Sequence, residues 1–469
     1  MPLPTCFHLP NELWCEIFEN LPREDLRQIH SVSSLFHDIS HSIFFRDFIL
    51  DPDRLDLATD EVIERLALYT SASIATHVRK LKVSFKFGPG FRSSSRNATA
   101  PISPSAVSPL LRSIQSFKNV RILECEFRFG SEVHFDDLGL QSLPNLTELR
   151  VVGARLYCPR TPTSSKIKVA HFSFSAIPEI VPDERGEADT RCSFLSALDP
   201  EALTSLTMSP SLHCSPGAWL ANDSDLFPTF RNLQSVTIDC DGPFLRPVHA
   251  FLVQLPALQH LTLTGRFCRS TEFTPTPGCS LPRTLQSFTG PAEYIPLFLA
   301  DTTCTRLAIN ACCRPDELYV TLLGTPLCVS AVTDFEVHLS LAGVCTWKAP
   351  HQLFAAFPKL KTARIRISHP SFYDGGSGVS GPAETPLFAP AYLPGLPCIL
   401  VAALRACATL FCVVIDWDLR DLAPCLLPDF VALREILLNG LAPRIMDIGF
   451  EGNLWNVRVT RRRWFGRVR

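Results

Sequence analysis

The sequence lacks the features that would mark a membrane protein or a generic nucleic-acid-binding protein. Among its 469 residues, 44 Lys and Arg oppose 46 Asp and Glu, and the formal net charge of −2 supplies no field that would hold a polyanion. The most apolar stretch, 393–415, is interrupted by Pro397 and by Arg405. A charge at the centre of a bilayer costs about 2.5–3.5 kcal/mol, so this stretch is expected to be a buried helix followed by a buried strand.

Methionine and tyrosine are scarce, with three and six residues, whereas proline is abundant, with 39. Frequent proline interrupts helices and central strands, which argues against one large helical bundle and favours many short elements. Hydrophobic residues make up 46% of the chain and charged residues 19%, which is ordinary for a folded protein and too apolar for a disordered one. The length predicts two to four domain-sized units.

A secretory signal is also lacking, because the N-terminus has neither a basic region nor an apolar core after it. The 18 cysteines are spread through a long chain rather than concentrated in a small disulfide scaffold. We therefore expect free thiols in a reducing compartment, the cytoplasm or the nucleus or both.

Motifs for catalysis and cofactor binding are missing as well. The sequence has no Walker A loop, no G-x-S-x-G elbow and no H-E-x-x-H zinc helix. A G-x-G-x-x-G match at 376–381 lies among Pro and Gly, whereas a dinucleotide site needs it between a strand and a helix. His37 and His41 are one helical turn apart but lack an evident third metal ligand. We assign no catalytic residue, metal ligand or cofactor.

The N-terminal fifty residues show helical periodicity. Leu13, Ile17 and Leu21 recur every four residues, which predicts an amphipathic helix that starts after Pro10 and is stopped by Pro22. A second amphipathic helix is expected after Pro22, with acids in its first turn and apolar residues at spacings of three and four: Leu26, Ile29, Val32, Phe36, Ile39 and Ile43.

A third apolar cluster, Phe44, Phe45 and Phe48, is expected to close this pair of helices. Some forty residues bury too little surface to be comfortably stable alone. Part of the apolar surface is therefore expected to be covered by a partner.

This segment resembles the F-box, the adaptor-binding module of ubiquitin-ligase substrate receptors. The resemblance covers under a tenth of the chain. It departs from the common pattern at Val32-Ser33-Ser34 and at Phe36, where the family often has Val-Cys, a basic residue and then Trp. The matching residues are Leu9, Pro10, Glu12, Ile17, Phe18, Leu21, Pro22, Asp25, Leu26, Ile29, Val32 and the late aromatics.

The resemblance implies docking on a Skp1-like adaptor, which joins the receptor to cullin and RING subunits. The interface would be of the helix-in-groove type, dominated by a few buried anchors. Some of these residues must also form the module's own core, and the sequence does not separate the two sets. The implied adaptor-contact residues are Leu9, Pro10, Leu13, Ile17, Phe18, Leu21, Leu26, Ile29 and Val32.

A recurring phrase runs through the rest of the chain: LPNL at 143–146, FRNL at 230–233, LPAL at 255–258 and FVAL at 430–433, each followed by alternating apolar residues. Each copy is typical of a turn that enters a short strand. Including weaker copies, thirteen anchors between residues 78 and 433 are on average about 30 residues apart, near the leucine-rich-repeat range. The weaker anchors are Val78, Val120, Ile167, Leu203, Leu285, Cys304, Val332, Leu360 and Leu410.

The pattern resembles degenerate leucine-rich repeats, a common companion of F-boxes. Regular repeats carry Asn or Cys eight residues after the anchor, where this chain has Ala154, Arg266 and Leu441. We therefore expect an α/β fold in which a helical F-box is followed by an irregular leucine-rich-repeat-like solenoid of short parallel strands with helices and turns. Some other α/β arrangement stays open.

The expected organisation has an F-box at 1–50 with its core at 7–48, a linker helix at 51–70 and a repeat domain at 71–459. Composition marks insertions near 87–109, 181–190 and 368–397. The basic tail, 460–469, is expected to be the solvated end of the last repeat. Its alternative functions are nuclear import, phosphate binding or contact with a substrate.

These features predict a non-catalytic substrate-recognition subunit of an SCF-type ubiquitin ligase. It would bind a Skp1-like adaptor through the F-box and a protein target through the repeats. One alternative is an adaptor-bound scaffold that takes no part in ubiquitination, which would differ only in whether cullin joins. The other is a repeat protein, or an enzyme without a recognised motif, whose N-terminal hairpin caps the solenoid.

Overall fold

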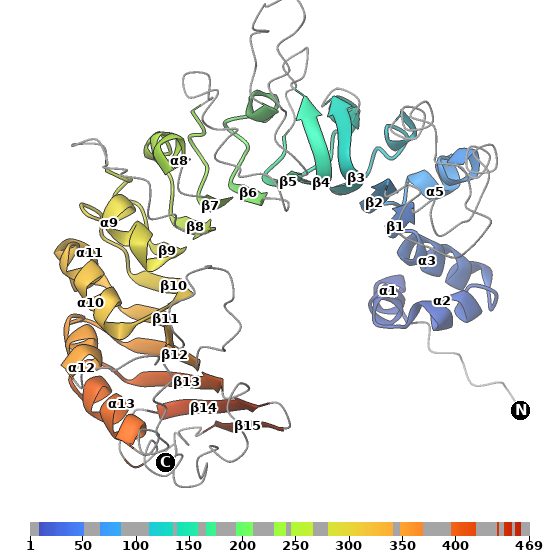
Figure 1. Ribbon diagram of the computed structural model, residues 1–469. Helices are drawn as coiled ribbons and strands as arrows, with labels where there is room; N and C mark the ends of the chain where they lie inside the picture. The colour runs from blue at the N-terminus through green and yellow to red at the C-terminus, as the bar shows by residue number, and fades with distance from the viewer. Residues whose placement is uncertain are drawn as a thin grey trace, which may run out of the picture. The chain divides into compact units, whose positions relative to one another are not determined.

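The computed structural model describes residues 9–50, 66–85, 112–134, 138–157, 166–174, 194–209, 229–240, 245–265, 280–340, 348–368, 395–418, 439, 445–452 and 455–460. The chain divides into two compact units, Met1–Leu233 and Gln234–Arg469. Both are α/β, and Figure 1 traces their elements in chain order. The insertions at 87–109 and 181–190, nearly all of 368–397, the anchor Leu433 and the tail from residue 461 lie outside the described residues.

The first unit opens with three helices, α1 (Asn11–Glu19), α2 (Arg23–Ile29) and α3 (Ser34–Phe44), which we call the helical module. The helix expected after Pro10 is confirmed, but the single second helix is wrong. It is divided because the Ser33 side chain accepts the Phe36 N–H at 3.1 Å and so caps a new helix. A serine at this position satisfies an N–H that the preceding helix could not, and the continuous apolar spacing concealed the break.

Among the described residues of the first unit, six parallel strands follow, each paired with the next along the chain. They are β1 (Asp47–Leu50), β2 (Lys80–Phe85), β3 (Ile122–His134), β4 (Glu148–Tyr157), β5 (Val169–Phe174) and β6 (Ser205–Ser209). The short helices between them are α5 (Ala72–Ala75), η3 (Leu140–Ser142) and η4 (Phe194–Ala197). Residues 66–69, within the expected linker helix, are helical.

Strand β1 lies within the segment expected to complete the F-box. Phe48 does not close the helical pair: it is buried in β1, with its ring 4.9 Å from that of Tyr69 and 6.1 Å from that of Phe117. The parallel sheet therefore begins at Asp47 rather than near Ser71. A four-residue strand has too short an alternation to be recognised from the sequence.

In the second unit, eight strands pair in parallel and a ninth runs antiparallel at the end. They are β7 (Ser235–Asp239), β8 (His260–Thr264), β9 (Ser287–Gly290), β10 (Arg306–Cys313), β11 (Asp334–Ser340), β12 (Thr362–Ser368), β13 (Cys412–Asp418), β14 (Ile445–Gly452) and the antiparallel β15 (Trp455–Thr460). The stretch at 393–415 is a helix, α13 (Gly395–Arg405), followed by strand β13, as expected.

The helices of the second unit lie along one side of its strands (Figure 1). They are α8 (Leu245–Val253), η6 (Ala292–Tyr294), α9 (Ile295–Phe298), α10 (Pro315–Leu323), α11 (Pro326–Ala331), α12 (Lys348–Ala355) and α13 (Gly395–Arg405). Strand β11 shows how the sheet is divided: Phe335, Val337 and Leu339 are buried, while the residues between them are half-exposed. The inward side chains form the core under the helices, and the outward ones leave a polar strand face.

The predicted repeat is confirmed in its spacing. All twelve anchors within the described residues are at most 3% exposed, and each stands two residues before a strand. Val78 precedes β2 and Leu410 precedes β13 in the same way. Phe45, two residues before β1, occupies the equivalent position of a first repeat that the sequence did not reveal.

Consecutive repeats are also joined by a repeated backbone bond. The carbonyl oxygen of the residue before one strand accepts two N–H bonds from the next repeat, one from the residue before its strand and one from the first residue of that strand. The Arg46 carbonyl accepts from Arg79 and Lys80, and the Arg79 carbonyl accepts from Arg121 and Ile122. These bonds satisfy the polar backbone at the strand entrances, which lies beside a buried core.

Asparagine side chains supply a second ladder, one residue before the anchors. Each donates to a backbone carbonyl of the preceding repeat: Asn119 to Thr76 at 2.7 Å, Asn145 to Lys118 at 3.1 Å and Asn232 to Glu201 at 2.8 Å. The regular family position, eight residues after the anchor, lacks Asn or Cys in these three repeats. The turns are therefore bonded from a different place, which explains why the sequence pattern appears degenerate.

Candidate functional site

The helical module has a small core made from all three helices. Phe18, Leu26 and Ile39 are its buried apolar residues, and others pack against them in part. The rings of Phe18 and Phe36 meet edge to face at 5.2 Å, and that of Trp14 lies 4.7 Å from Phe36. Such aromatic pairs add to the burial of area, so a small bundle gains stability from few residues. The partly buried members are Trp14, Cys15, Leu21, Ile29, Phe36 and Ile43.

Other apolar side chains of the module face away from this core. Leu13 and Ile17, one turn apart on α1, are 42% and 43% exposed, and Val32 between α2 and α3 is 66% exposed. Leu9 and Leu35 are 38% and 41% exposed. Lone exposed apolar residues are common, but five in a segment of under thirty residues make this segment a candidate for binding a partner. We call these five residues the apolar surface.

The structure separates the nine residues that the sequence grouped as adaptor contacts. Phe18 and Leu26 lie in the core, and Leu21 and Ile29 pack against it. The outward-facing members are Leu9, Pro10, Leu13, Ile17 and Val32. Leu35 was missed, because its place on the outer side of α3 depends on the helix beginning at Ser34.

The module is tied to the first strand by polar contacts. Arg46, immediately before β1, forms an ion pair with Glu19 at the end of α1, and both side chains are half-exposed. The Arg46 carbonyl accepts two N–H bonds from the start of β2. The chain leaves α3 and enters the sheet through this residue, so the orientation of the apolar surface follows from the first repeat.

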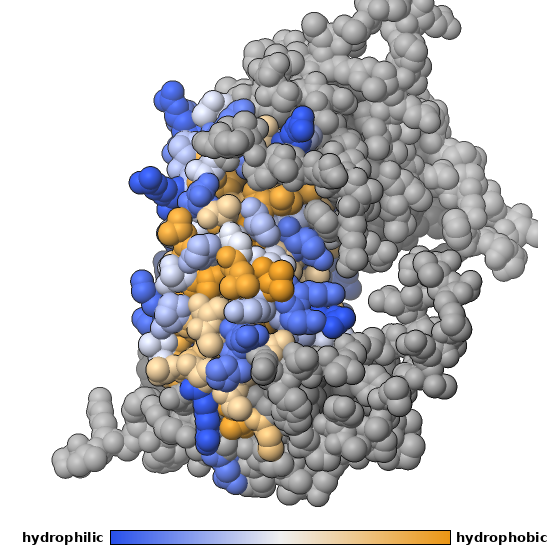
Figure 2. Space-filling model, turned by 60° about the vertical axis from the view of Figure 1, so that its left-hand side comes forward, coloured by the Kyte–Doolittle hydropathy of each residue, from blue (hydrophilic) through white to orange (hydrophobic). Residues whose placement is uncertain are grey.

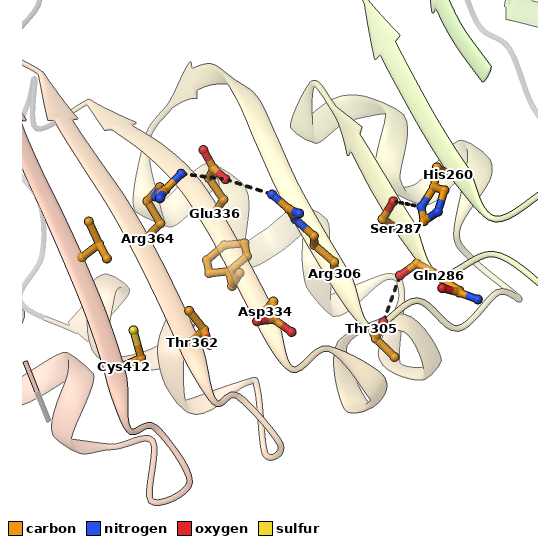
Figure 3. Close-up of a pocket in the computed structure, with 12 residues that line it drawn as sticks. His260, Gln286, Ser287, Thr305, Arg306, Asp334, Glu336, Thr362, Arg364 and Cys412 are labelled. Carbon is orange, nitrogen blue, oxygen red and sulfur yellow. Dashed lines mark hydrogen bonds and ion pairs between the residues drawn. The ribbon is translucent and has the colours of Figure 1, made fainter. Parts of the chain in front are cut away.

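A second candidate site lies on the strand face of the second unit (Figure 3). Arg306 on β10 and Arg364 on β12 approach the Glu336 carboxylate of β11 from either side, at 3.7 and 3.9 Å. Beside them the His260 Nδ1 lies 2.9 Å from the Ser287 hydroxyl. The parallel strands place these side chains in rows, and together they line an open hollow.

The hollow offers binding groups rather than an activated nucleophile. Cys412 lines it, but partial burial raises the pKa of this thiol, although the nearby Arg364 opposes that effect. A thiol with a raised pKa is a poor nucleophile at neutral pH. Guanidinium, carboxylate, amide and hydroxyl groups are instead suited to hydrogen bonding with a protein partner.

The helix side of the second unit carries exposed apolar residues as well. Val320, Leu323 and Leu327 on α10 and α11 are 68%, 59% and 52% exposed. Figure 2 shows apolar side chains on this side with polar ones around them. They provide a matched comparison for the apolar surface of the helical module.

In the described ranges, no group of three or more His, Cys, Asp or Glu side chains is arranged to hold a metal ion. None of the helices in those ranges is long and apolar enough to cross a bilayer. The ten cysteines that fall within them are all free thiols.

Comparison with known proteins identifies the N-terminal segment. Residues 6–48 match the F-box domain. The match spans the three helices and the first residues of β1. No curated protein matches the chain.

Several solved structures resemble the chain at low identity. The leucine-rich-repeat-containing protein LegL7 from Legionella pneumophila has 12% identity and a TM-score of 0.33, covering 76% of this chain and 97% of its own. The structure of the complex of Rad7 and Elc1 in yeast has 12% identity and a TM-score of 0.33, and the match covers 89% of this chain and 92% of the matched chain. The leucine-rich repeat domain of APL1B has 11% identity and a TM-score of 0.29, and the match covers 95% of this chain and 93% of the matched chain.

The fold itself agrees with that expected from the sequence. Parallel strands follow one another in chain order, buried anchors recur two residues before each described strand from β2 to β13, and helices cover one side in the second unit. F-box domains and repeats of this kind are typically interaction modules without catalysis. The chain carries an F-box domain at residues 6–48, followed by a leucine-rich-repeat-like α/β solenoid.

Proposed function

We propose that this protein is a substrate-recognition subunit of an SCF-type ubiquitin ligase, acting in the cytoplasm or the nucleus. Its F-box would bind a Skp1-like adaptor, which joins it to cullin and RING subunits, and its solenoid would hold a protein target. The observation that carries the proposal is the apolar surface, left exposed on a module that matches the F-box. Burial of such aliphatic anchors in a partner's groove is a favourable source of binding energy.

The role proposed for the chain is positional. A receptor that holds a target lysine near a charged conjugating enzyme raises the effective concentration of the two reactants. No bond is made or broken by the receptor's own residues. The polar strand face with Arg306, Glu336 and Arg364 is the surface that we propose for target contact, since its donors and acceptors point away from the core.

The test is binding of a purified Skp1-like adaptor, with and without cullin, to the intact chain. The double variant Leu13→Asp, Ile17→Asp should bind adaptor at least about 100-fold more weakly, because two anchors become charged. Circular dichroism should show retained folding, since neither side chain lies in the core.

The matched control is Val320→Asp, Leu323→Asp on α10, where two apolar residues that are more exposed than Leu13 and Ile17 receive the same charges. It should bind adaptor as the unmodified chain does. Equal loss in both variants, or failure of the intact chain to bind any adaptor, would contradict the proposal. Binding of adaptor without cullin would indicate the scaffold alternative.

A further inference from the structure

Four histidines gather where the helical module meets the first strands. His30 follows the end of α2, His37 and His41 stand one turn apart on α3, and His77 lies in the turn between α5 and β2. The ring centroids of His30 and His37 are 3.9 Å apart, those of His37 and His41 5.5 Å, and those of His41 and His77 5.3 Å. We call these four residues the histidine cluster.

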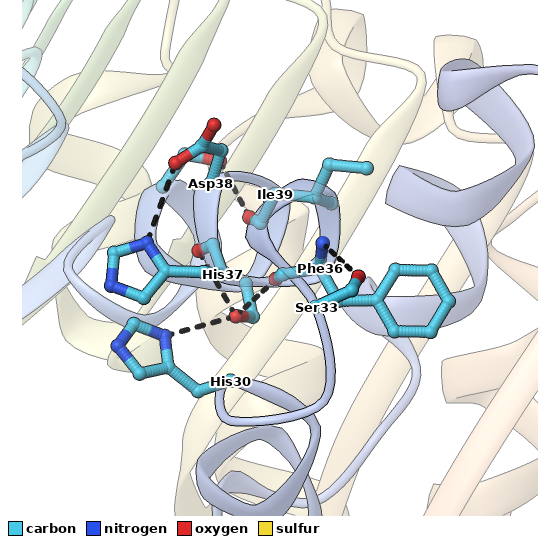
Figure 4. A network of polar contacts seen from close by, with 8 residues as sticks. His30, Ser33, Phe36, His37, Asp38 and Ile39 are labelled. Atoms are coloured by element: carbon cyan, nitrogen blue, oxygen red, sulfur yellow. Dashed lines mark hydrogen bonds and ion pairs between the residues drawn. The ribbon is translucent and has the colours of Figure 1, made fainter.

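The cluster is held by polar neighbours that Figure 4 shows in part. The His30 Nδ1 lies 3.1 Å from the Ser40 hydroxyl, which itself donates to the Phe36 carbonyl of α3. The His37 Nδ1 lies 3.3 Å from the Asp38 carboxylate. On its other side His41 packs against the ring of Phe45 at 4.7 Å. The histidines thus connect α2, α3 and the entrance to β2.

The rings of His30, His37 and His41 are roughly parallel, whereas His77 meets His41 edge-on, at an interplanar angle of 77°. The planes of His37 and His41 differ by 24°, and those of His30 and His41 by 21°. Neutral imidazoles stack in this way, whereas imidazolium ions at such distances repel one another. Asp38 is the only acid that lowers this repulsion among the groups that act on His41, and it is itself exposed.

The titration of the cluster agrees with this geometry. Burial is the largest cause that lowers the pKa of His41, followed by the charges of His77, His37 and His30, while Asp38 opposes them. The pKa of His30 is lowered by burial and then by His37. In the unfolded chain His30 and His41 take up protons near their ordinary pKa of 6.5, before they do so in the folded module.

We propose that the histidine cluster is a proton-sensitive contact, which holds the helical module on the first repeat while its rings are neutral and loosens that attachment when they are protonated. The direction follows from linkage: the unfolded segment binds more protons, so the stabilisation is complete above pH 6.5 and declines as the pH falls below it. The proposal does not require that an adaptor binds the module.

The test is hydrogen exchange of the full-length chain, read as protection factors for α3 at pH of about 7.5 and about 5.5, after correction for intrinsic rates. Strands β11 and β12 serve as the internal reference. The equilibrium constant for the opening of α3 should increase by up to about tenfold for each unit by which the pKa of His30 or His41 lies below 6.5. Protection of α3 that is the same at both pH values would overturn the proposal.

Two variants assign the effect to the cluster. His37→Gln, His41→Gln should remove most of the pH dependence from α3, whereas the matched control His260→Gln, His351→Gln, in the second unit, should retain it. A double variant with the same decrease in protection as the unmodified chain would also overturn the proposal. If the double variant does not fold, His77→Gln provides the comparison, because it lies outside the three helices and removes the contact with His41.

Discussion

The helical module and the solenoid repeats differ in how completely they bury their apolar side chains. In the module, three residues form the buried core while five aliphatic side chains remain exposed. In a repeat such as that of β11, every inward-facing side chain of the strand is at most 2% exposed. A strand between two others is covered on both sides by neighbours of the same shape, whereas a module of forty residues has no such neighbours. The exposed surface of the module is therefore available to a partner.

The two regions also differ in how they satisfy their backbone. In the module, capping and intrahelical bonds complete each helix separately, as Ser33 does for α3. In the repeats, the N–H groups at the start of a strand donate to a backbone carbonyl of the preceding repeat. We expect a destabilising substitution in the module to affect the module alone, and one in the solenoid to destabilise the adjacent strands as well.

The largest effect is expected from Phe18→Ala. Deleting a buried aromatic side chain costs about 3–5 kcal/mol, and the three-residue core has nothing to replace it. Hydrogen exchange should show α1 to α3 unprotected while β11 and β12 keep their protection. Phe411→Ala, which removes a ring that is 58% exposed, is the control and should leave both regions unchanged. A loss of protection in β11 would contradict the independence of the two regions.

A smaller effect is expected from Gly265→Ala in the turn after β8. Gly265 has φ +115°, and a Cβ there would stand 2.5 Å from the Cys240 carbonyl oxygen. Backbone strain of this kind costs about 1–3 kcal/mol. Denaturant unfolding should show the loss, and exchange should increase in β7 and β8 together while α1 to α3 stay protected. Gly324→Ala, at an ordinary φ with its nearest contact at 3.4 Å, provides the comparison.

The smallest effect is expected from Glu336→Gln on the strand face. The carboxylate is shared by two half-exposed arginines at 3.7 and 3.9 Å, and such pairs contribute about 0–1 kcal/mol. The unfolding midpoint should shift little, and the shift should vanish at high salt because the pair is screened. A stability loss as large as that of Gly265→Ala would show that this face has a structural role.

The sequence predicted the solenoid through a single local signal. An apolar residue two positions before a strand must be buried wherever that repeat stacks on another, so Leu146 and Leu258 could be recognised without knowledge of their partners. The break at Ser33 could not be recognised in this way, because Leu26 and Ile39 keep a helical spacing across it. Strand β1 escaped notice because only Phe48 and Leu50 alternate inward.

The candidate sites depended more on tertiary structure. The sequence grouped Phe18 with Ile17 as adaptor contacts, because both belong to the same apolar stripe. Their exposures of 2% and 43% are set by where α3 packs against α1. Periodicity reports which side of a helix is apolar, but it does not report how much of that side a neighbour covers.

The sequence by itself determined the module, the repeat spacing and the alternation of each strand, since these follow from local periodicity and from residues close together in the chain. Only the tertiary structure decided which aliphatic residues remain exposed, and it alone brought His30 and His77 to the same cluster as His37 and His41. Contacts between segments far apart in the chain depend on packing, and neither spacing nor composition encodes them in a readable form.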